Sequence, residues 1–92
     1  MISILIPCYN YNAYDLVSRL EKECLTLGIV FEIISIDDAS FSTLNEANQK
    51  INMLTNCKFF ESKKNIGRVA NRQLLSQKAQ YKWLLYIDVD VK

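Results

Sequence analysis

Four short apolar runs, separated by stretches of helical length, limit the folds that this chain can adopt. The runs are rich in β-branched or aromatic residues, which favour strands, and they cover residues 2–6, 31–36, 58–62 and 83–87. Connections of helical length between consecutive strands are typical of parallel strands joined by crossovers. We therefore expect an α/β fold in which helices cover both faces of a parallel sheet.

Two of the three intervals between these runs have clear helical limits. In the first interval, apolar residues recur at helical spacing from Ala13 to Leu27, and Gly28 is expected to end the helix. The opposite, charged side of this helix is expected to contain Arg19, Glu21, Lys22 and Glu23. The third interval predicts a helix over residues 68–79.

The second interval predicts a helix that begins at a capping motif. Ser42 or Thr43 can cap its first turn, and Glu46 stands three residues after Thr43, as a capping box requires. The apolar stripe that we expect to face the sheet consists of Leu44, Ala47, Ile51 and Leu54.

Composition restricts the chemistry that the chain can perform. It contains no histidine, which excludes Ser-His-Asp and Cys-His catalysis and every histidine-ligated metal site. Cys8, Cys24 and Cys57 lack the CxxC spacing and are expected to be reduced, buried hydrophobes. The net charge is only +1, so we expect no nucleic-acid partner.

Acidic residues follow two of the predicted strands at the points where the strands end. Asp37 and Asp38 follow the second strand, and Asp88 and Asp90 follow the fourth. Ligands of open parallel sheets bind at the carboxyl ends of the strands, so we expect these carboxylates to lie on one edge. Carboxylates at close range repel one another, and a divalent cation relieves that repulsion. Mg²⁺ or Mn²⁺ is therefore the expected cofactor.

Basic residues precede and begin the third predicted helix. Lys63 and Lys64 lead to Arg68 and Arg72, which lie one helical turn apart and can meet a diphosphate. A simpler interpretation remains open for each charged group. The arginines can lie on a solvated helix face, the DxD aspartates can be a surface pair, and the DD pair can be an acidic cluster at a helix N-terminus.

These motifs together resemble the family 2 glycosyltransferases, which have the GT-A fold. The family's opening V-S-I-I-I-P-T-Y-N is similar to residues 2–10, ISILIPCYN, and its E-I-I-V-V-D-D-G-S is similar to residues 32–40, EIISIDDAS. Its N-x-G-x-x-A-x-R stretch is matched by Asn65, Gly67, Ala70 and Arg72. Its DxD motif is matched by Asp88-Val89-Asp90, so the resemblance covers essentially the whole chain.

The resemblance implies a fold and an activity. The fold is a Rossmann-like GT-A half, with a parallel sheet of about four strands in the order 3-2-1-4 and three flanking helices. The activity is transfer of a sugar, with inversion, from a nucleotide-diphosphate donor, for which a UDP-sugar is expected. The acceptor is a saccharide or a lipid-linked molecule, and the reaction takes place in the cytoplasm, at the inner face of a membrane.

The resemblance also assigns the residues that surround the nucleotide. Cys8 and Tyr9, next to Pro7, are expected to border the base. Asp38 is expected to meet the edge of the base, and Asp37 to support the site.

The resemblance also assigns the residues that contact the diphosphate and the metal. Arg72, and with it Arg68, is expected near the diphosphate or the ribose. Asp88 is expected to contact the ribose or the metal, and Asp90 to be the main metal ligand. A metal held there would neutralise the leaving diphosphate as a Lewis acid.

Some residues depart from the family pattern. Cys8 replaces a Thr or Ser and removes a hydroxyl beside the base. Ala39 replaces a Gly, so the backbone there is less free to adopt a positive φ. Gln73 and Tyr81 stand where the family has Asn and Gly. None of these changes removes an expected metal ligand. They bear on the predicted identity of the donor base more than on the predicted family.

The family's acceptor half and its general base come after the DxD motif, and this chain stops two residues after Asp90. We therefore expect residues 1–92 to be the N-terminal, donor-binding part of a longer protein, with no catalytic residue of its own and no transfer activity alone. Without the next strand, residues 83–87 would form an unprotected apolar edge, so we expect self-association there.

Other nucleotide-binding folds give competing interpretations. A nucleotide-binding α/β module without catalysis would use the same site and remains open. A dinucleotide-binding Rossmann unit is disfavoured, because the turn at residues 7–12 contains no glycine. A phosphoaspartate receiver is disfavoured because Lys82 precedes the fourth strand instead of following a strand.

Overall fold

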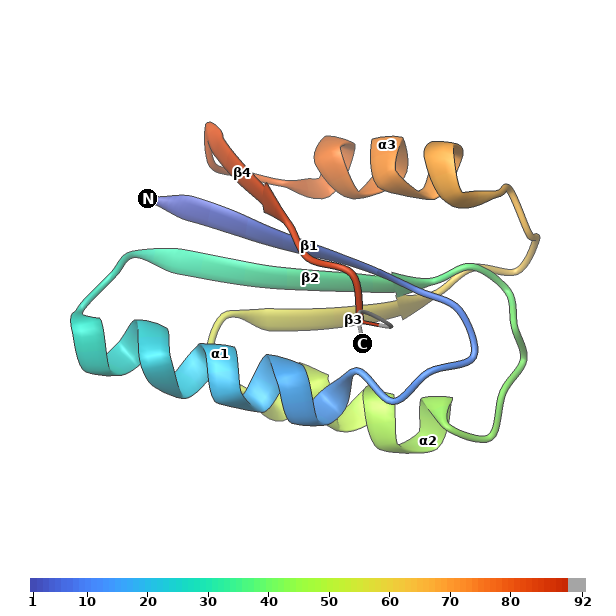
Figure 1. The fold of residues 1–92 in the computed structure, drawn as a ribbon, viewed down its shortest axis with the longest axis horizontal. Helices are drawn as coiled ribbons and strands as arrows, with labels where there is room; N and C mark the ends of the chain where they lie inside the picture. Colours follow the sequence, from blue (N-terminus) through green and yellow to red (C-terminus); the bar gives the residue numbers. More distant parts are fainter. Residues whose placement is uncertain (90–92) are drawn as a thin grey trace.

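The structure is a computed structural model that describes residues 1–89. Its strands are β1 (Ile2–Cys8), β2 (Phe31–Asp37), β3 (Cys57–Glu61) and β4 (Trp83–Tyr86). Its helices are α1 (Tyr14–Leu27), α2 (Asn45–Asn48), the 3-10 helix η1 (Gln49–Met53) and α3 (Arg68–Lys78). Figure 1 shows α3 on one face of the sheet and α1 with α2 on the other. Within the described part of the chain, no helix is long and apolar enough to cross a membrane.

The strands form one parallel sheet in the order β3-β2-β1-β4. The central pair, β1 and β2, runs in register from Ile2 opposite Phe31 to Cys8 opposite Asp37. Beyond β4 the chain continues along β1, because the Ile87 N–H donates to the Leu5 carbonyl at 3.0 Å. The predicted α/β class and the predicted strand order are both confirmed.

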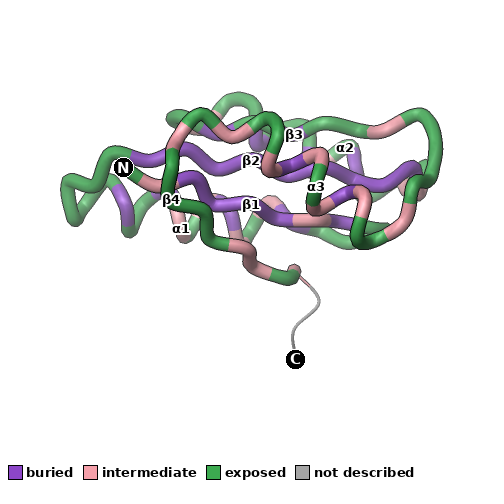
Figure 2. Tube along the Cα trace, turned by 90° about the horizontal axis from the view of Figure 1, so that it is seen from above, coloured by how far each residue is buried: buried purple, intermediate pink, exposed green. Residues whose placement is uncertain are grey.

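The core has one part on each face of the sheet. The face toward α1 buries Ile4, Ile6, Ile33 and Phe59. The face toward α3 buries Leu5, Ile34, Ile36 and Leu75. Figure 2 shows β1 and β2 buried along most of their length. Successive strand residues point to opposite faces, so strands covered on both sides need the continuous apolar runs seen in the sequence.

Helix α1 ends as predicted, but one of its charged residues faces inward. Gly28 has a φ of 69°, the left-handed conformation that commonly ends helices. The expectation that Glu21 lies on the charged outer side is wrong, since its side chain is buried. Its carboxylate accepts a hydrogen bond from the Thr55 N–H, between η1 and β3, and this bond offsets the cost of burying the charge.

The predicted second helix forms as two short pieces, α2 and η1, and its inward face is partly polar. Ile51 is fully buried as expected, but Leu44, the first residue of the predicted apolar stripe, is 40% exposed. Asn45 and Asn48 are buried in this segment instead. Asparagine side chains bond to nearby backbone and compete with regular helix, which is consistent with the short α2.

The predicted capping box is also absent from this segment. No side chain caps α2, whose N-cap residue is Leu44, so Thr43 and Glu46 do not form the expected pair. The Ser42 hydroxyl instead accepts the Leu44 N–H at 3.0 Å. The serine stabilises the turn that leads into the helix.

Asn48 explains why polar residues face inward here. Its Oδ1 accepts the Ala13 N–H at 2.8 Å, and its Nδ2 donates to the Tyr11 carbonyl at 2.8 Å and to Asn45 Oδ1 at 3.0 Å. Asn48 therefore supplies partners for the buried backbone between β1 and α1. Without Asn48 the Ala13 N–H would lie buried and unpaired.

A second buried polar cluster lies at the amino end of the sheet. Glu32 accepts hydrogen bonds from the Ser3 hydroxyl at 2.6 Å and from the Gln80 N–H at 2.7 Å. The Tyr81 N–H donates to Ser3 Oγ at 3.2 Å. These bonds fasten the α3–β4 connection onto β1 and β2.

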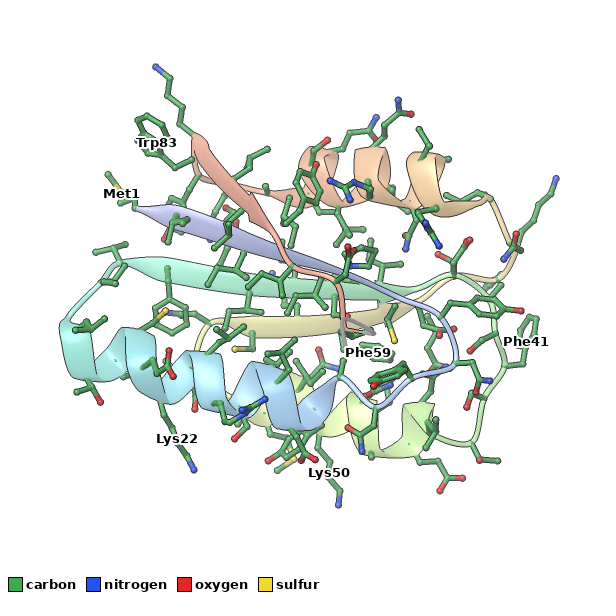
Figure 3. All side chains as sticks on the ribbon, viewed as in Figure 1. Met1, Lys22, Phe41, Lys50, Phe59 and Trp83 are labelled. Carbon is green, nitrogen blue, oxygen red and sulfur yellow. The ribbon has the colours of Figure 1, made fainter. Side chains whose placement is uncertain are left out.

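Strand β4 is an exposed edge of the sheet. Trp83 is 72% exposed, and Leu84 and Leu85 are also exposed. Figure 3 shows Trp83 at the start of β4, pointing away from the rest of the molecule. The predicted apolar edge is therefore present.

Replacing Asn48 by alanine is expected to destabilise the fold by about 1–3 kcal/mol, because the buried Ala13 N–H loses its partner and the Tyr11 carbonyl loses the shorter of its two hydrogen bonds. Urea unfolding followed by circular dichroism measures the change. Lys50→Ala, an exposed position on η1, is the matched control and should change stability by less than about 0.5 kcal/mol. Equal effects of the two substitutions would contradict this role of Asn48.

Candidate functional site

A cleft of about 430 Å³ opens where β1 and β2 end, between the start of α3 and the chain that follows β4. The predicted site residues that line it are Pro7, Cys8, Tyr9, Asp38, Arg68 and Asp88. It is also lined by Asn65, Gly67, Asn71 and Val89, which were not predicted as site residues. The cleft therefore lies at the sheet edge where the sequence pattern predicted a site.

Asp38 joins the end of β2 to the loop before α3. Its carboxylate accepts the Ile66 and Gly67 N–H groups, both at 2.9 Å. Its carbonyl accepts a hydrogen bond from Asn65 Nδ2 at 2.9 Å, and its own N–H donates to the Cys8 carbonyl at 3.0 Å. Each carboxylate oxygen thus already accepts one hydrogen bond, and Asp38 fixes the position of α3 over the cleft.

Asp37 lies behind the cleft and is not among the residues that line it. Its fully buried carboxylate accepts the Asn10 N–H at 3.2 Å and the Ser40 N–H at 2.9 Å. The Ser40 hydroxyl donates to both carboxylate oxygens, at 2.7 and 2.9 Å. Asp37 therefore holds the turns after β1 and after β2.

The turn after β2 has left-handed backbone at a position where the family has glycine. Ala39 has a φ of 57°, which costs an L-residue with a Cβ roughly 1–2 kcal/mol. The bonds that Asp37 accepts from Ser40 hold this turn closed. The reduced freedom of alanine does not prevent the positive φ, which the surrounding hydrogen bonds impose.

Cys8 contributes a protonated thiol to the cleft. Its Sγ donates to the Tyr11 carbonyl at 3.4 Å. Burial, and secondly the negative charge of Asp37, raise the pKa of the thiol from 9.0 to about 12. The raised pKa keeps this thiol protonated at neutral pH and makes Cys8 a poor nucleophile.

The two predicted arginines lie in different places. Arg68, the first residue of α3, lines the cleft. Arg72 does not line it: the guanidinium carbon lies 4.4 Å from the ring centroid of Tyr86, whose hydroxyl donates to the Arg72 carbonyl. Stacking on β4 therefore holds Arg72 outside the cleft.

Only part of the predicted metal site falls within the described residues. Asp88 is exposed and lines the cleft, whereas Asp90, the predicted main ligand, lies outside the described residues. Among residues 1–89, no cluster of three or more acidic or cysteine side chains could hold a metal. Asp88 supplies one carboxylate, which suits Mg²⁺ or Mn²⁺ if phosphate and water oxygens complete the coordination shell.

Asn71 is a cleft residue that the sequence did not suggest. It lies in the second turn of α3, on the face that also carries the buried Leu75 four residues later. Its Nδ2 donates to the Ile36 carbonyl at 3.1 Å, and its Oδ1 is buried without a partner among the described residues. The available signal was an asparagine at an inward position of an amphipathic helix.

Comparison with known sequences identifies a family and some relatives. The family model described as "Glycosyl transferase family 2" matches residues 3–92. Two proteins of Pseudomonas aeruginosa, from strains LESB58 and UCBPP-PA14, are each 45% identical to this chain over 42 residues. Both are named undecaprenyl-phosphate 4-deoxy-4-formamido-L-arabinose transferase. The match covers 44% of this chain and 12% of each relative.

Comparison of structures gives the same fold. The crystal structure of S. aureus TarS superposes on 97% of this chain with a TM-score of 0.68 and 26% sequence identity. The crystal structure of S. aureus TarS 1–349 superposes on 97% of it with a TM-score of 0.67 and 22% identity, a likeness in fold. This chain spans 16% and 27% of those two chains. The match supports the GT-A-like arrangement that the sequence resemblance predicted.

The buried thiols predict a loss of stability at alkaline pH. Burial raises the pKa of Cys8 and of Cys57 to about 12 from 9.0, so the unfolded chain loses these protons at lower pH than the folded chain does. Their contribution is complete below pH 9.0 and is lost as the pH rises towards 12. Each thiol is expected to cost up to about 1.4 kcal/mol per pH unit in that window.

Urea unfolding at a series of pH values from 8 to 10.5 tests this. Cys8→Ala should reduce the slope of stability against pH, and Cys8→Ala/Cys57→Ala should reduce it further. An unchanged slope in the double variant would show that the thiols are not its source.

Proposed function

This chain belongs to glycosyl transferase family 2, and from that premise we propose that its cleft binds the nucleoside diphosphate of a sugar donor. The observation that carries the proposal is the meeting of Asp38, Arg68 and Asp88 around one cleft at the carboxyl ends of the strands. These residues come from three separate segments of the chain. Two carboxylates and a guanidinium that line one cleft support a ligand with both a hydrogen-bonding base and negatively charged phosphates.

The nucleoside lies, in this proposal, at the end of β1. Tyr9 is 59% exposed beside the cleft and offers a ring face to the base. Pro7 and the protonated Cys8 form the wall next to it, and Asp38 fixes the loop opposite. A UDP-sugar is the donor that we propose.

The diphosphate lies at the N-terminus of α3. Arg68 supplies a positive charge there, and the helix dipole adds a partial positive charge. The placement of Arg72 against Tyr86 argues against direct contact between that guanidinium and the phosphates. We therefore assign the phosphate contact to Arg68 alone.

Asp88, together with Asp90, would hold Mg²⁺ or Mn²⁺ against the diphosphate. A metal held there supplies Lewis-acid neutralisation of the leaving diphosphate. The protein's own contribution is to orient the donor through Arg68 and the end of β1, so that an acceptor can attack the sugar with inversion. No catalytic base is assigned within this chain.

The acceptor and the rest of the reaction are proposed from the relatives. The Pseudomonas relatives are named for undecaprenyl phosphate, and this chain spans 12% of their length. We propose a lipid-linked or saccharide acceptor, met at the cytoplasmic face of a membrane. Acceptor binding and the general base are proposed to belong to the parts of such proteins that this chain does not span, so that the 92 residues alone transfer no sugar.

Self-association through β4 is proposed from its exposed apolar edge. Trp83, Leu84 and Leu85 lie at the open side of the sheet, where unpaired backbone and apolar side chains can pair with another copy.

Calorimetry with UDP tests the donor proposal. The wild-type chain should bind UDP, and Mn²⁺ should tighten binding about tenfold or more through Asp88. Asp88→Asn should lose most of that gain while keeping the affinity measured in EDTA. Asp15→Asn, an exposed first-turn carboxylate of α1 away from the cleft, is the matched control. Absence of UDP binding at millimolar concentration would refute the proposed function.

Sedimentation velocity at increasing concentration tests the edge proposal. The wild-type chain should show a reversible increase in mass, and Trp83→Lys should shift it to higher concentration about tenfold, because a charge at an edge strand opposes pairing. Lys22→Ala, on the exposed side of α1, should have no effect. A monomeric profile for the wild-type chain at every concentration would rule out the association.

A further inference from the structure

The outer edge of β3 is covered by a side chain that takes the place of a neighbouring strand. β3 stands at one end of the order β3-β2-β1-β4 (Figure 1). Asn52, in η1, lies against it: its Oδ1 accepts the Phe59 N–H at 2.8 Å, and its Nδ2 donates to the Phe59 carbonyl at 3.4 Å. The amide thus offers one acceptor and one donor to a single residue, as a paired strand does.

Phe59 is the middle one of three β3 residues whose backbone points away from the sheet. The carbonyl of Asn56, just before β3, accepts a hydrogen bond from β2, and the N–H of Ser62, just after β3, donates one to β2, each at 2.9 Å. In a parallel pair, alternate residues of a strand bond to the same neighbour. The odd-numbered residues between them, Cys57, Phe59 and Glu61, therefore direct their N–H and C=O groups outward. Asn52 occupies the centre of this edge.

Gln49 holds Asn52 in this position. Gln49 Oε1 accepts a hydrogen bond from Asn52 Nδ2 at 3.0 Å, and Gln49 Nε2 donates to the Glu61 carboxylate at 2.6 Å. The cover that η1 provides is therefore anchored to β3 at two positions, Phe59 and Glu61.

Without that cover, the edge fits a second copy of the same strand. Two β3 strands paired antiparallel about Phe59 would set the two Phe59 residues opposite each other, and their outward N–H and C=O groups could exchange both hydrogen bonds. This register sets Lys58 opposite Phe60 and Cys57 opposite Glu61. No like charges would stand opposite each other, so the edge is complementary to itself.

We propose that the outer edge of β3 is a pairing surface for a second copy of this chain and that Asn52 keeps it closed. An uncovered strand edge pairs with other chains unless a charge, a proline or a covering segment prevents it. Here the covering segment is η1, and one amide makes the contact with the strand backbone. The inference goes beyond the proposed function, because it needs no nucleotide in the cleft.

Sedimentation velocity tests the closure in a Trp83→Lys background, which opposes pairing through β4. At concentrations where Trp83→Lys is a monomer, Trp83→Lys/Asn52→Ala should form a species of twice the monomer mass. Its association should begin at a concentration about tenfold lower or less, because the Phe59 backbone then bonds to a second copy. The mass should stop at the dimer, since a two-fold pairing closes on itself.

Two control variants separate an opened edge from a loss of stability. Asn52→Lys removes the same two bonds but places a positive charge at the edge, so in the same background it should stay monomeric. Asn48→Ala removes hydrogen bonds elsewhere in the segment and should also stay monomeric. Association of either control to the same extent as Asn52→Ala would assign the effect to unfolding and overturn the proposal.

Hydrogen exchange at the Phe59 amide identifies the edge that pairs. In the wild-type monomer this amide should be protected, because it is bonded to Asn52. In Trp83→Lys/Asn52→Ala it should exchange about tenfold faster or more in dilute solution. It should become protected again as the concentration rises and a second copy supplies the carbonyl. The Lys58 amide, which faces β2, should be protected throughout.

The two measurements together decide the proposal. Dimers of the double variant with renewed protection of Phe59 would support it. A monomeric double variant at every concentration would overturn it, as would dimers in which the Phe59 amide stays unprotected, or rapid exchange at Phe59 in the wild-type monomer. Should Asn52→Ala fail to fold, Gln49→Ala, which removes the residue that holds Asn52, should show the same association, and its absence there would overturn the closure.

Discussion

The parallel pairing of β1 with β2 is the constraint on which the cleft depends. It sets Cys8 opposite Asp37, and the Asp38 N–H extends the ladder to the Cys8 carbonyl. Helices pack against both faces of these strands, and close-packed interiors resist small displacements. The polar residues beyond the strand ends therefore take their positions from the apolar core that fixes the strands.

Asp37, the last residue of β2, and Asp38, the residue that follows it, have different hydrogen-bond partners. Asp37 faces the turns after β1 and β2 and is fully buried among their N–H groups. Asp38 faces the loop that begins α3. The hydrogen bonds of Asp37 and Asp38 thus hold three loops at the end of β2. The shape of the cleft depends on these hydrogen bonds to backbone more than on the negative charge of the two carboxylates.

Much of this arrangement was predictable because it follows from patterns with a physical period. The apolar runs predicted the strands, and the helical intervals between them predicted a parallel sheet, which brings Cys8, Asp38 and Asp88 to one edge. Side-chain orientation was less accessible. The inward turns of Glu21 and Asn48 depend on backbone groups far away in the sequence, at Thr55 and Ala13. Arg72 has the spacing of a cleft residue, yet Tyr86 offers its ring on the other side.

The bonds of Glu32 lie at the far end of the sheet from the cleft, yet they bear on its geometry. Glu32 and Ser3 hold the backbone at Gln80 and Tyr81 where β4 begins, and β4 leads directly to Asp88. A substitution at Glu32 would therefore shift the starting point of the strand that delivers a cleft carboxylate. In a mutational scan scored by ligand affinity, Glu32 would register as a binding residue although it lies at the opposite end of β2 from the cleft. Such a scan needs a parallel stability measurement before its positions are read as contacts.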